Sequence, residues 1–395
     1  MKNIEVNIKM IIVTIILFSF LEPDYVKANS VLHIIFYIIR IIGILLSIIV
    51  VIKKQRILYV SLLVTLYYFV YGFSTILNGG DLTGLISDAI PIWGFVVWVE
   101  IILRYSPLKG LSILNFVYST LVYINVLFFL VFPNGYTSYY TSAGIVVRYF
   151  LGVYNQFATY LIPAVVISVV HSMVNYNKIT IQSKLLIATV SFTFIYFWSA
   201  TSIIGIFLII IYLLFVHKGW LRYMVNNKTI AVSTLILFIV VIYFNNLNAF
   251  SFIIEDLLKK DLTLSTRTRI WDIAKLMISE SPYFGYGYLE GGKYVYITQS
   301  IQRSAHNTIL QILLQSGFFG LLTFVLLILV FFKRVKKFKT KRITRFILFS
   351  LFTSLTMMLS EVYPLNFMYL ILLLGIFTPN IIKEKAKFEG NTRIS

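Results

Sequence analysis

The 395-residue sequence contains no cysteine, only four histidines and little charge. Without cysteine, disulfide bonds and thiolate metal sites are excluded. Charged residues make up 12% of the chain, about half of the roughly 25% found in soluble domains. The histidines are not clustered with acidic residues, so neither a metal nor another cofactor is expected. Repeats and low-complexity tracts are also missing, which leaves one integral membrane domain as the simplest organisation.

Long apolar runs fill most of the chain, and hydrophobic residues account for 59% of it. Each run is expected to be a helix, because a helix satisfies its own backbone hydrogen bonds in lipid. The predicted fold class is an all-α polytopic membrane protein with about twelve transmembrane helices and one large extracytoplasmic loop containing short interfacial helices. The predicted spans are 9–21, 31–52, 57–77, 84–104, 111–132, 150–173, 183–199, 201–217, 229–245, 316–332, 343–360 and 363–380.

The net charge of +19 lies in short Lys and Arg clusters between the apolar runs. This is the positive-inside pattern of a membrane protein, and it argues against nucleic acid as a partner. The densest cluster is KRVKKFKTKR at 333–342. The pattern predicts a membrane protein with both termini in the cytoplasm, and the many Ile, Lys, Tyr and Asn residues are typical of an AT-rich bacterial genome. The first span is either a retained anchor or a signal cleaved after Ala28, and both alternatives leave Asn29 outside.

The predicted organisation has three parts: a transmembrane bundle at 1–245, an extracytoplasmic catalytic loop at 246–315, and C-terminal transmembrane helices with a cytoplasmic tail at 316–395. The loop is the candidate for chemistry, because long structured loops in compact proteins are usually functional. Within it, RIWDIAKLMISESP (269–282) has the period of a short interfacial helix. The glycines of FGYGYLEGG (284–292) fit backbone turns rather than a dinucleotide fingerprint.

Three arginines of this loop are candidates for phosphate binding: Arg267, Arg269 and Arg303. The planar guanidinium suits bidentate phosphate recognition, although contact with lipid headgroups is an equally simple explanation. His306 lies in RSAHNTILQILLQSG (303–317), where a helix capped by Ser304 and ended by Gly317 is predicted. A histidine one turn into that helix either transfers a proton or is satisfied by a backbone carbonyl.

Charged residues inside or beside other predicted spans form a second set of candidates. Arg40 lies near the middle of the second span, where a charge usually faces a partner or a cavity. Its expected partner is either Asp88 or a ligand phosphate. Arg148, Gly152 and Asn155 have i, i+4, i+7 spacing, which predicts one helical face at the start of the sixth span. Anchoring of that span at the headgroups is the alternative role of Arg148.

Three segments together resemble the bacterial O-antigen polymerase and O-antigen ligase superfamily. STRTRIWDIAKLMISESPYFGYGY (265–288) is similar to the family's arginine–tryptophan helix with a proline and a glycine pair. SAHNTILQILLQSGFFG (304–320) is similar to its His-Asn stretch, and VVRYFLGVYNQFA (146–158) to its arginine–glycine–asparagine pattern. Two departures are Thr266, where the family often has glycine, and WSATSIIGI (198–206), which lacks the family's arginine.

The resemblance implies a metal-independent glycosyltransferase that uses a lipid-diphosphate-linked donor, with a lipid-linked glycosyltransferase type of fold. Its implied partners are undecaprenyl-diphosphate-linked glycan donor and acceptor, the lipid bilayer and other polysaccharide-assembly proteins. The expected function is polymerisation of oligosaccharide repeat units into O-antigen, capsular or exopolysaccharide chains. The resemblance implies His306 and Arg267 as catalytic residues. The implied substrate-binding residues are Arg148, Arg303, Asn307, Asn155 and Trp271. Arg40 is a further substrate-binding candidate because of its place in the second span.

Two other functions remain open from the sequence. A ligase of the same superfamily would transfer finished glycan to another acceptor, and sequence patterns do not separate it from a polymerase. A polysaccharide flippase or transporter would be expected to show inverted repeats and paired charges at mid-membrane. No convincing repeat is present, and a transporter does not need an outer loop with Arg, His and Asn.

Overall fold

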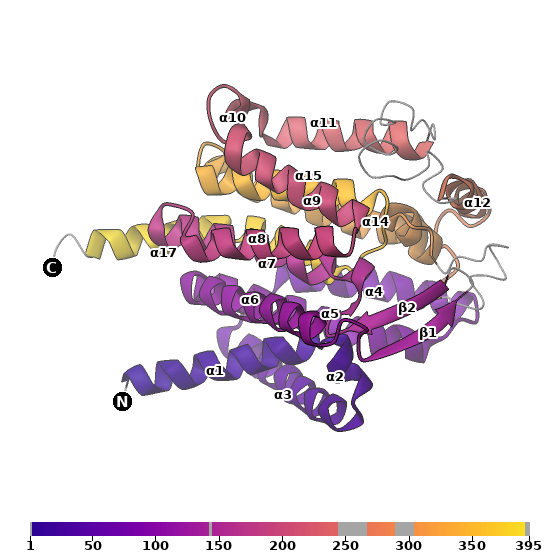
Figure 1. Ribbon diagram of the computed structural model, residues 1–395, viewed down its shortest axis with the longest axis horizontal. Helices are drawn as coiled ribbons and strands as arrows, with labels where there is room; N and C mark the ends of the chain where they lie inside the picture. The colour runs from indigo at the N-terminus through magenta and orange to yellow at the C-terminus, as the bar shows by residue number, and fades with distance from the viewer. Residues whose placement is uncertain (1, 142–143, 244–266, 289–303, 392–395) are drawn as a thin grey trace.

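The computed structural model describes residues 2–141, 144–243, 267–288 and 304–391, and within them the chain is a helical bundle with one small sheet (Figure 1). The elements before residue 160 are α1 (Lys2–Leu21), α2 (Asp24–Ala28), α3 (Ser30–Lys54), α4 (Tyr59–Leu77), α5 (Leu82–Tyr105), α6 (Pro107–Val131), β1 (Thr137–Thr141), β2 (Gly144–Tyr149), β3 (Gly152–Val153) and the 3₁₀ turn η1 (Tyr154–Gln156). They are followed by α7 (Ala158–Tyr176), α8 (Ile181–Tyr196), α9 (Ala200–Ile211) with the π-turn η2 (Tyr212–Val216), α10 (Leu221–Met224), and α11 (Asn227–Phe238) with the π-turn η3 (Ile239–Tyr243). The last elements are α12 (Arg267–Glu280), α14 (Thr308–Val335), the 3₁₀ turn η6 (Lys336–Phe338), α15 (Arg342–Met358), α16 (Asn366–Ile376) and α17 (Thr378–Asn391).

Among the described helices, six are long and apolar enough to cross a membrane, and the bent pair of α16 and α17 makes seven if it counts as one span. Four further apolar helices are shorter, with ranges of 8–21, 181–196, 200–216 and 227–242. These findings support the predicted helical membrane class. Each predicted span falls on a helix, but the number of spans, about twelve by length and hydropathy, stays a prediction.

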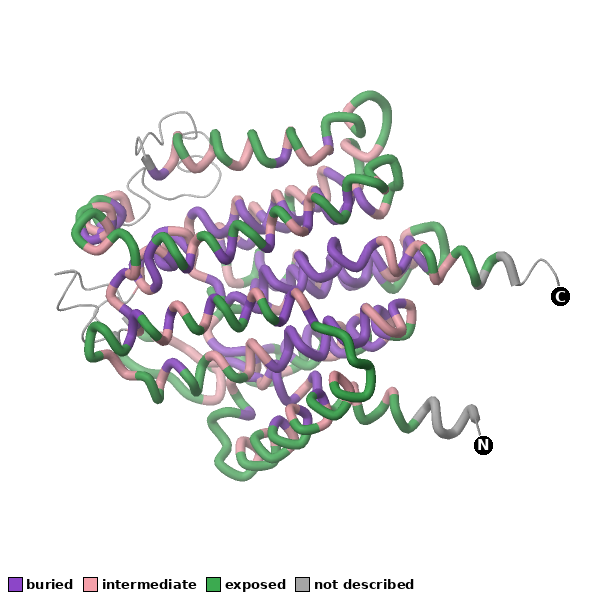
Figure 2. Tube along the Cα trace, turned by 180° about the vertical axis from the view of Figure 1, so that it is seen from behind, coloured by how far each residue is buried: buried purple, intermediate pink, exposed green. Residues whose placement is uncertain are grey.

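The core of the bundle is built around α7 and α16. All residues of α16 are buried, and 89% of the most apolar window of the α7 segment is buried, against 17% for α3. A helix that is apolar on all sides is stable only when it is surrounded, either by protein or by lipid. Burial in Figure 2 is accordingly concentrated in the middle of the bundle, and the outer helices expose apolar side chains.

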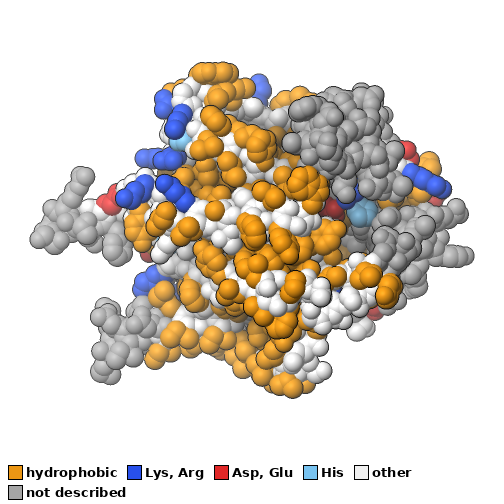
Figure 3. Space-filling view, viewed as in Figure 1, with side chains coloured by type: hydrophobic (Ala, Val, Ile, Leu, Met, Phe, Trp, Pro, Cys, Tyr) orange, Lys and Arg blue, Asp and Glu red, His pale blue; other side chains and the backbone are white. Residues whose placement is uncertain are grey.

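Charged and apolar side chains occupy different parts of the bundle along its length. Figure 3 shows hydrophobic side chains over the middle of one face, with Lys and Arg gathered at the end where both chain termini lie. The α12 helix, the sheet and α2 lie at the opposite end (Figure 1). The two termini thus share one end, as the charge pattern predicted. That this end is cytoplasmic remains an expectation.

The segment from 137 to 156 differs from the predicted start of a helix. Arg148 lies in β2, Gly152 in β3 and Asn155 in η1, so the predicted i, i+4, i+7 helical face is wrong. The strands form an antiparallel sheet of order β1-β2-β3, with Thr137 paired to Arg148 and Arg148 to Val153. The run IVVRYF is β-branched and aromatic, which favours strands when the segment lies outside the hydrocarbon core.

Candidate active site

The α12 helix lies at the end of the bundle away from the termini and begins with Arg267. Of the apolar face that the helical period predicts, Ile270, Ala274 and Met277 are buried, whereas Ile273 and Ile278 are half-buried. Trp271 is completely buried and packs in one cluster with residues of η3, α14 and the α15–α16 connection. Full burial gives Trp271 a packing role in placing Arg267, and its contact with a substrate stays a prediction. Truncation of a buried tryptophan typically costs about 3–5 kcal/mol.

The loop after α12 packs against a break in the helix α14 and forms hydrogen bonds with it. Gly317 lies within α14 at φ 59° and ψ −160°, which divides the helix into a short first part and a long second part, as predicted. The loop closes this break through four backbone hydrogen bonds, of which the shortest run from Phe318 N to Pro282 O (2.8 Å) and from Tyr286 N to Leu314 O (2.7 Å). A Cβ atom on Gly317 would lie 2.3 Å from the backbone of Tyr283, so only glycine fits.

The same loop is tied to α4 and α5. Asn78 Nδ2 donates to Gly285 O at 3.1 Å, and Tyr288 N donates to Thr75 Oγ1 at 2.9 Å. The Tyr288 hydroxyl donates to Asp88 Oδ2 at 2.6 Å. These bonds fix residues 285–288, in the interior of the predicted catalytic loop, to the N-terminal half of the bundle, over a sequence distance of about 200 residues.

Glu361 joins the two predicted catalytic residues. Its Oε1 atom accepts a hydrogen bond from Arg267 Nη2 at 2.7 Å, and its Oε2 atom lies 3.6 Å from His306 Nδ1. All three side chains are partly accessible, with exposed fractions of 20% for Arg267, 24% for His306 and 18% for Glu361. A guanidinium, an imidazole and a carboxylate from three separate segments therefore meet at the surface of this end.

The backbone around these side chains is held by buried polar contacts. Arg267 Nη1 also donates to the Ser360 carbonyl oxygen, and Thr308 Oγ1 donates to Glu361 O at 2.8 Å. Asn307 is fully buried; its Nδ2 donates to Leu359 O at 2.9 Å, and its Oδ1 accepts from Leu310 N at 2.9 Å. Asn307 therefore caps α14 and ties it to the segment that carries Glu361, a structural role instead of the predicted ligand contact.

His306 lies just before α14, not one turn into it as predicted, because Asn307 rather than Ser304 is the N-cap. Its φ of 46° places it in the left-handed region, which costs a non-glycine residue about 1–2 kcal/mol. Ala305 N donates to Gln311 Oε1 at 2.9 Å, which turns the chain back over the helix start. Strain of this kind clusters at functional sites, and here it directs the imidazole toward Glu361.

The electrostatics keep Glu361 ionised. Burial raises the pKa of the Glu361 carboxyl, but the contact with His306 and the positive charge of Arg267 outweigh burial and leave that pKa below its ordinary value. A carboxylate in this position holds the Arg267 guanidinium and the His306 imidazole in place. In the described part of the chain, no group of three or more His, Asp or Glu residues has the arrangement of a metal site.

The other predicted arginines lie in separate surroundings. Arg148 Nε lies 3.3 Å from Asp24 Oδ2, which also accepts from the Tyr136 hydroxyl at 2.7 Å. Burial and Asp24 raise the pKa of Tyr136 to about 12, so this hydroxyl remains a donor. No described contact joins Arg148 to Arg267, and Arg303 lies outside the described residues.

Arg40 has a protein partner in the structure. It forms an ion pair with Glu22, whose other oxygen lies 2.7 Å from His33 Nδ1. Because Asp88 binds Tyr288 instead, the alternative pair of Arg40 with Asp88 is wrong. Asn155 lies in η1 and is exposed.

Sequence reasoning missed the carboxylates of this end of the molecule. Glu361 lies between the predicted spans 343–360 and 363–380 but has no predicted role, and neither do Glu22 and Asp24. One signal was available: acidic residues make up only 15 of 395 positions, so each one beside a membrane span needs a partner. Which arginine each would meet depends on how the helices pack.

The comparison with protein families gives one match. Residues 185–325 match the family model described as O-antigen ligase. The match contains Arg267 and His306, whereas Glu361 lies beyond it. No curated protein and no solved structure matches the chain. Over residues 185–325, the chain is thus similar to the O-antigen ligase family, which supports the predicted resemblance to the superfamily of O-antigen polymerases and ligases.

Proposed function

We propose that the protein polymerises undecaprenyl-diphosphate-linked oligosaccharide repeat units at the outer face of the cytoplasmic membrane. One lipid-linked glycan is the donor, and the sugar end of a second lipid-linked unit is the acceptor. The observation that carries the proposal is the Glu361 bridge between Arg267 and His306. It joins a cation suited to a phosphate with a group able to accept a proton.

In the proposed reaction, a hydroxyl oxygen of the acceptor sugar attacks the anomeric carbon of the donor. The bond between that carbon and the diphosphate oxygen breaks, and the lipid diphosphate leaves. His306 takes the hydroxyl proton. Arg267 neutralises the charge that builds on the departing diphosphate, where preorganised donors act without reorganisation. No metal takes part in this scheme.

Glu361 would set the direction of proton transfer. Since Nδ1 of His306 faces the carboxylate, the Nδ1–H form is favoured, and Nε2 is then the nitrogen that accepts the proton. The position of the site fits a lipid-linked substrate. It lies at the end of the bundle opposite the termini (Figure 1), where a diphosphate and sugar would extend from a tail in the bilayer.

The test is the length of surface glycan in cells that carry Arg267→Ala or His306→Ala. We expect single repeat units to reach the surface without being joined. Lys275→Ala is the matched control, because Lys275 is a cation on the same helix that pairs with Asp272 at 2.7 Å. Long chains from both site variants at normal expression would contradict the proposal.

The same experiment separates the other functions. The family description favours a ligase as the second candidate. Loss of a ligase would leave finished polymer on its lipid carrier, because polymerisation itself would continue. Loss of a flippase or transporter would trap lipid-linked units inside the cell.

A further inference from the structure

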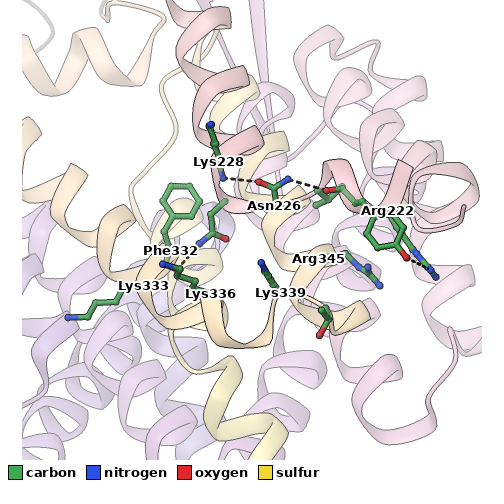
Figure 4. A pocket seen from close by; sticks show the side chains of 12 residues that line it. Arg222, Asn226, Lys228, Phe332, Lys333, Lys336, Lys339 and Arg345 are labelled. Atoms are coloured by element: carbon green, nitrogen blue, oxygen red, sulfur yellow. Dashed lines mark hydrogen bonds between the residues drawn. The ribbon is translucent and has the colours of Figure 1, made fainter. Parts of the chain in front are cut away.

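A basic pocket lies at the Lys- and Arg-rich end, away from the proposed active site. Its volume is about 740 Å³. One wall comes from the α10–α11 segment, with Arg222, Asn226 and Lys228, and the other comes from the end of α14 and η6 (Figure 4). The lining cations are Arg222, Lys228, Lys333, Lys336, Lys339 and Arg345, and no Asp or Glu lines the pocket.

The charge of this pocket is not neutralised by the described part of the protein. Among the described residues, none of its six cations forms an ion pair with a carboxylate. The segment 332–345 contributes eight Lys and Arg residues and no acid. Lys339 and Arg345 lie between the two walls in Figure 4. Like charges gathered around one cavity repel each other, so an anion bound there would be stabilising.

An apolar groove adjoins the basic pocket. It is lined by residues including Leu221, Met224, Ile230 and Phe352, and Val225 lines both the groove and the pocket. A soluble phosphate would use only the basic part. A molecule with an anionic head and a hydrocarbon chain would use both, and basic pockets between membrane helices on the cytoplasmic side bind lipid headgroups.

One uncharged polar atom indicates the kind of headgroup. Asn227 lines the pocket, and its Nδ2 donates to Phe332 O at 2.8 Å. Its Oδ1 atom is buried and has no hydrogen-bond partner among the described residues. An unsatisfied buried acceptor is unfavourable by about 1–3 kcal/mol, and a headgroup hydroxyl would satisfy it.

We propose that this pocket and groove bind an anionic phospholipid with a hydroxyl-bearing headgroup, such as phosphatidylglycerol, from the adjacent leaflet. The phosphate lies among the lysines and arginines, and one acyl chain follows the groove beside α11. The site is distinct from the Arg267–Glu361–His306 constellation, which lies at the opposite end of the bundle (Figure 1).

The test measures binding of fluorescent phosphatidylglycerol to the full-length protein in detergent. The double variant Lys336→Gln, Lys339→Gln should weaken binding roughly 25-fold, since each surface cation contributes about fivefold. Both lysines are exposed, so the fold should tolerate the change. The matched control is Lys383→Gln, Lys387→Gln, which removes two exposed lysines of α17 at the same end. It should retain wild-type affinity.

Two further binding measurements distinguish a lipid ligand from a soluble phosphate. Met224→Gln changes an exposed groove residue and should weaken binding of phosphatidylglycerol but not of glycerol 3-phosphate. Glycerol 3-phosphate that binds as tightly as the lipid would overturn the lipid assignment, because the groove would then contribute nothing. Equal loss of binding in the α17 control, or equal binding of phosphatidylcholine, would overturn the site itself.

Discussion

The substitution Glu361→Gln tests the central arrangement with almost no change in shape. In the wild type, Arg267 Nη2 donates to Oε1 at 2.7 Å and His306 Nδ1 faces Oε2 at 3.6 Å. A glutamine has one oxygen, and Arg267 can only donate. The amide oxygen should therefore turn to Arg267 and the amide NH₂ to His306.

This reversal changes the form of the imidazole. With an NH₂ group beside it, Nδ1 of His306 must accept a hydrogen bond, and Nε2 then carries the proton. In that tautomer the proposed base cannot accept a proton from the sugar hydroxyl. General-base catalysis contributes about 10²–10⁴-fold, so turnover should fall by roughly that factor. Loss of one charge-assisted hydrogen bond should reduce stability by only about 1.5–3 kcal/mol.

The assay is turnover of purified lipid-linked repeat units by the protein in detergent, with thermal unfolding measured on the same preparation. Glu280→Gln is the control. Glu280 is an exposed residue at the end of α12 that, within the described ranges, accepts a side-chain hydrogen bond only from the Tyr286 hydroxyl, at 3.2 Å. Turnover of Glu361→Gln within about threefold of wild type, less than the range for a lost base, would refute the proposed role of Glu361.

Three other predictions concern the same region. Arg267→Lys should retain the charge but lose the fork that reaches both Ser360 O and Glu361, and turnover should fall by about 10²-fold, as for one lost oxyanion donor; wild-type turnover would show that bidentate geometry is not needed. Gly317→Ala should lower stability by about 2–4 kcal/mol, because it adds left-handed strain and a clash with Tyr283. Gly219→Ala is its control in thermal unfolding, since Gly219 has φ +53° but nothing within 4 Å of the added Cβ. Equal losses of stability in the two variants would contradict the proposed packing of the loop against the break at Gly317. Because the folded-state pKa of Glu361 is below its ordinary value of 4.5, its stabilisation is complete above about pH 4.5 and is lost as the pH falls through the folded value. Thermal unfolding of wild type and Glu361→Gln should therefore converge at acid pH, and a constant difference down to the lowest pH would contradict this linkage.

Much of the architecture followed from local sequence. Apolar run length predicts helices wherever the backbone must satisfy itself in lipid, and the charge clusters predicted that both termini share one end. The sequence also predicted the amphipathic helix at 269–282 and the helix break at Gly317. Both features depend only on neighbours within a few residues. The helix predicted around Arg148 was wrong. That segment forms strands because its aromatic and β-branched residues lie outside the hydrocarbon core.

The composition of the candidate site was only partly available from sequence. Arg267 and His306 were predicted from a family resemblance, and the matching family domain contains both. Glu361 lies 94 residues from Arg267 along the chain, and no spacing rule predicts a contact over that separation.

Length, composition and charge by themselves determined a helical membrane protein, because those properties act through the bilayer and not through particular contacts. The tertiary structure decided which carboxylate each arginine meets. Arg40 meets Glu22, Arg148 meets Asp24, and Arg267 meets Glu361. The physical reason is that an ion pair forms over a few ångströms, and only the packing of helices brings such distant residues that close.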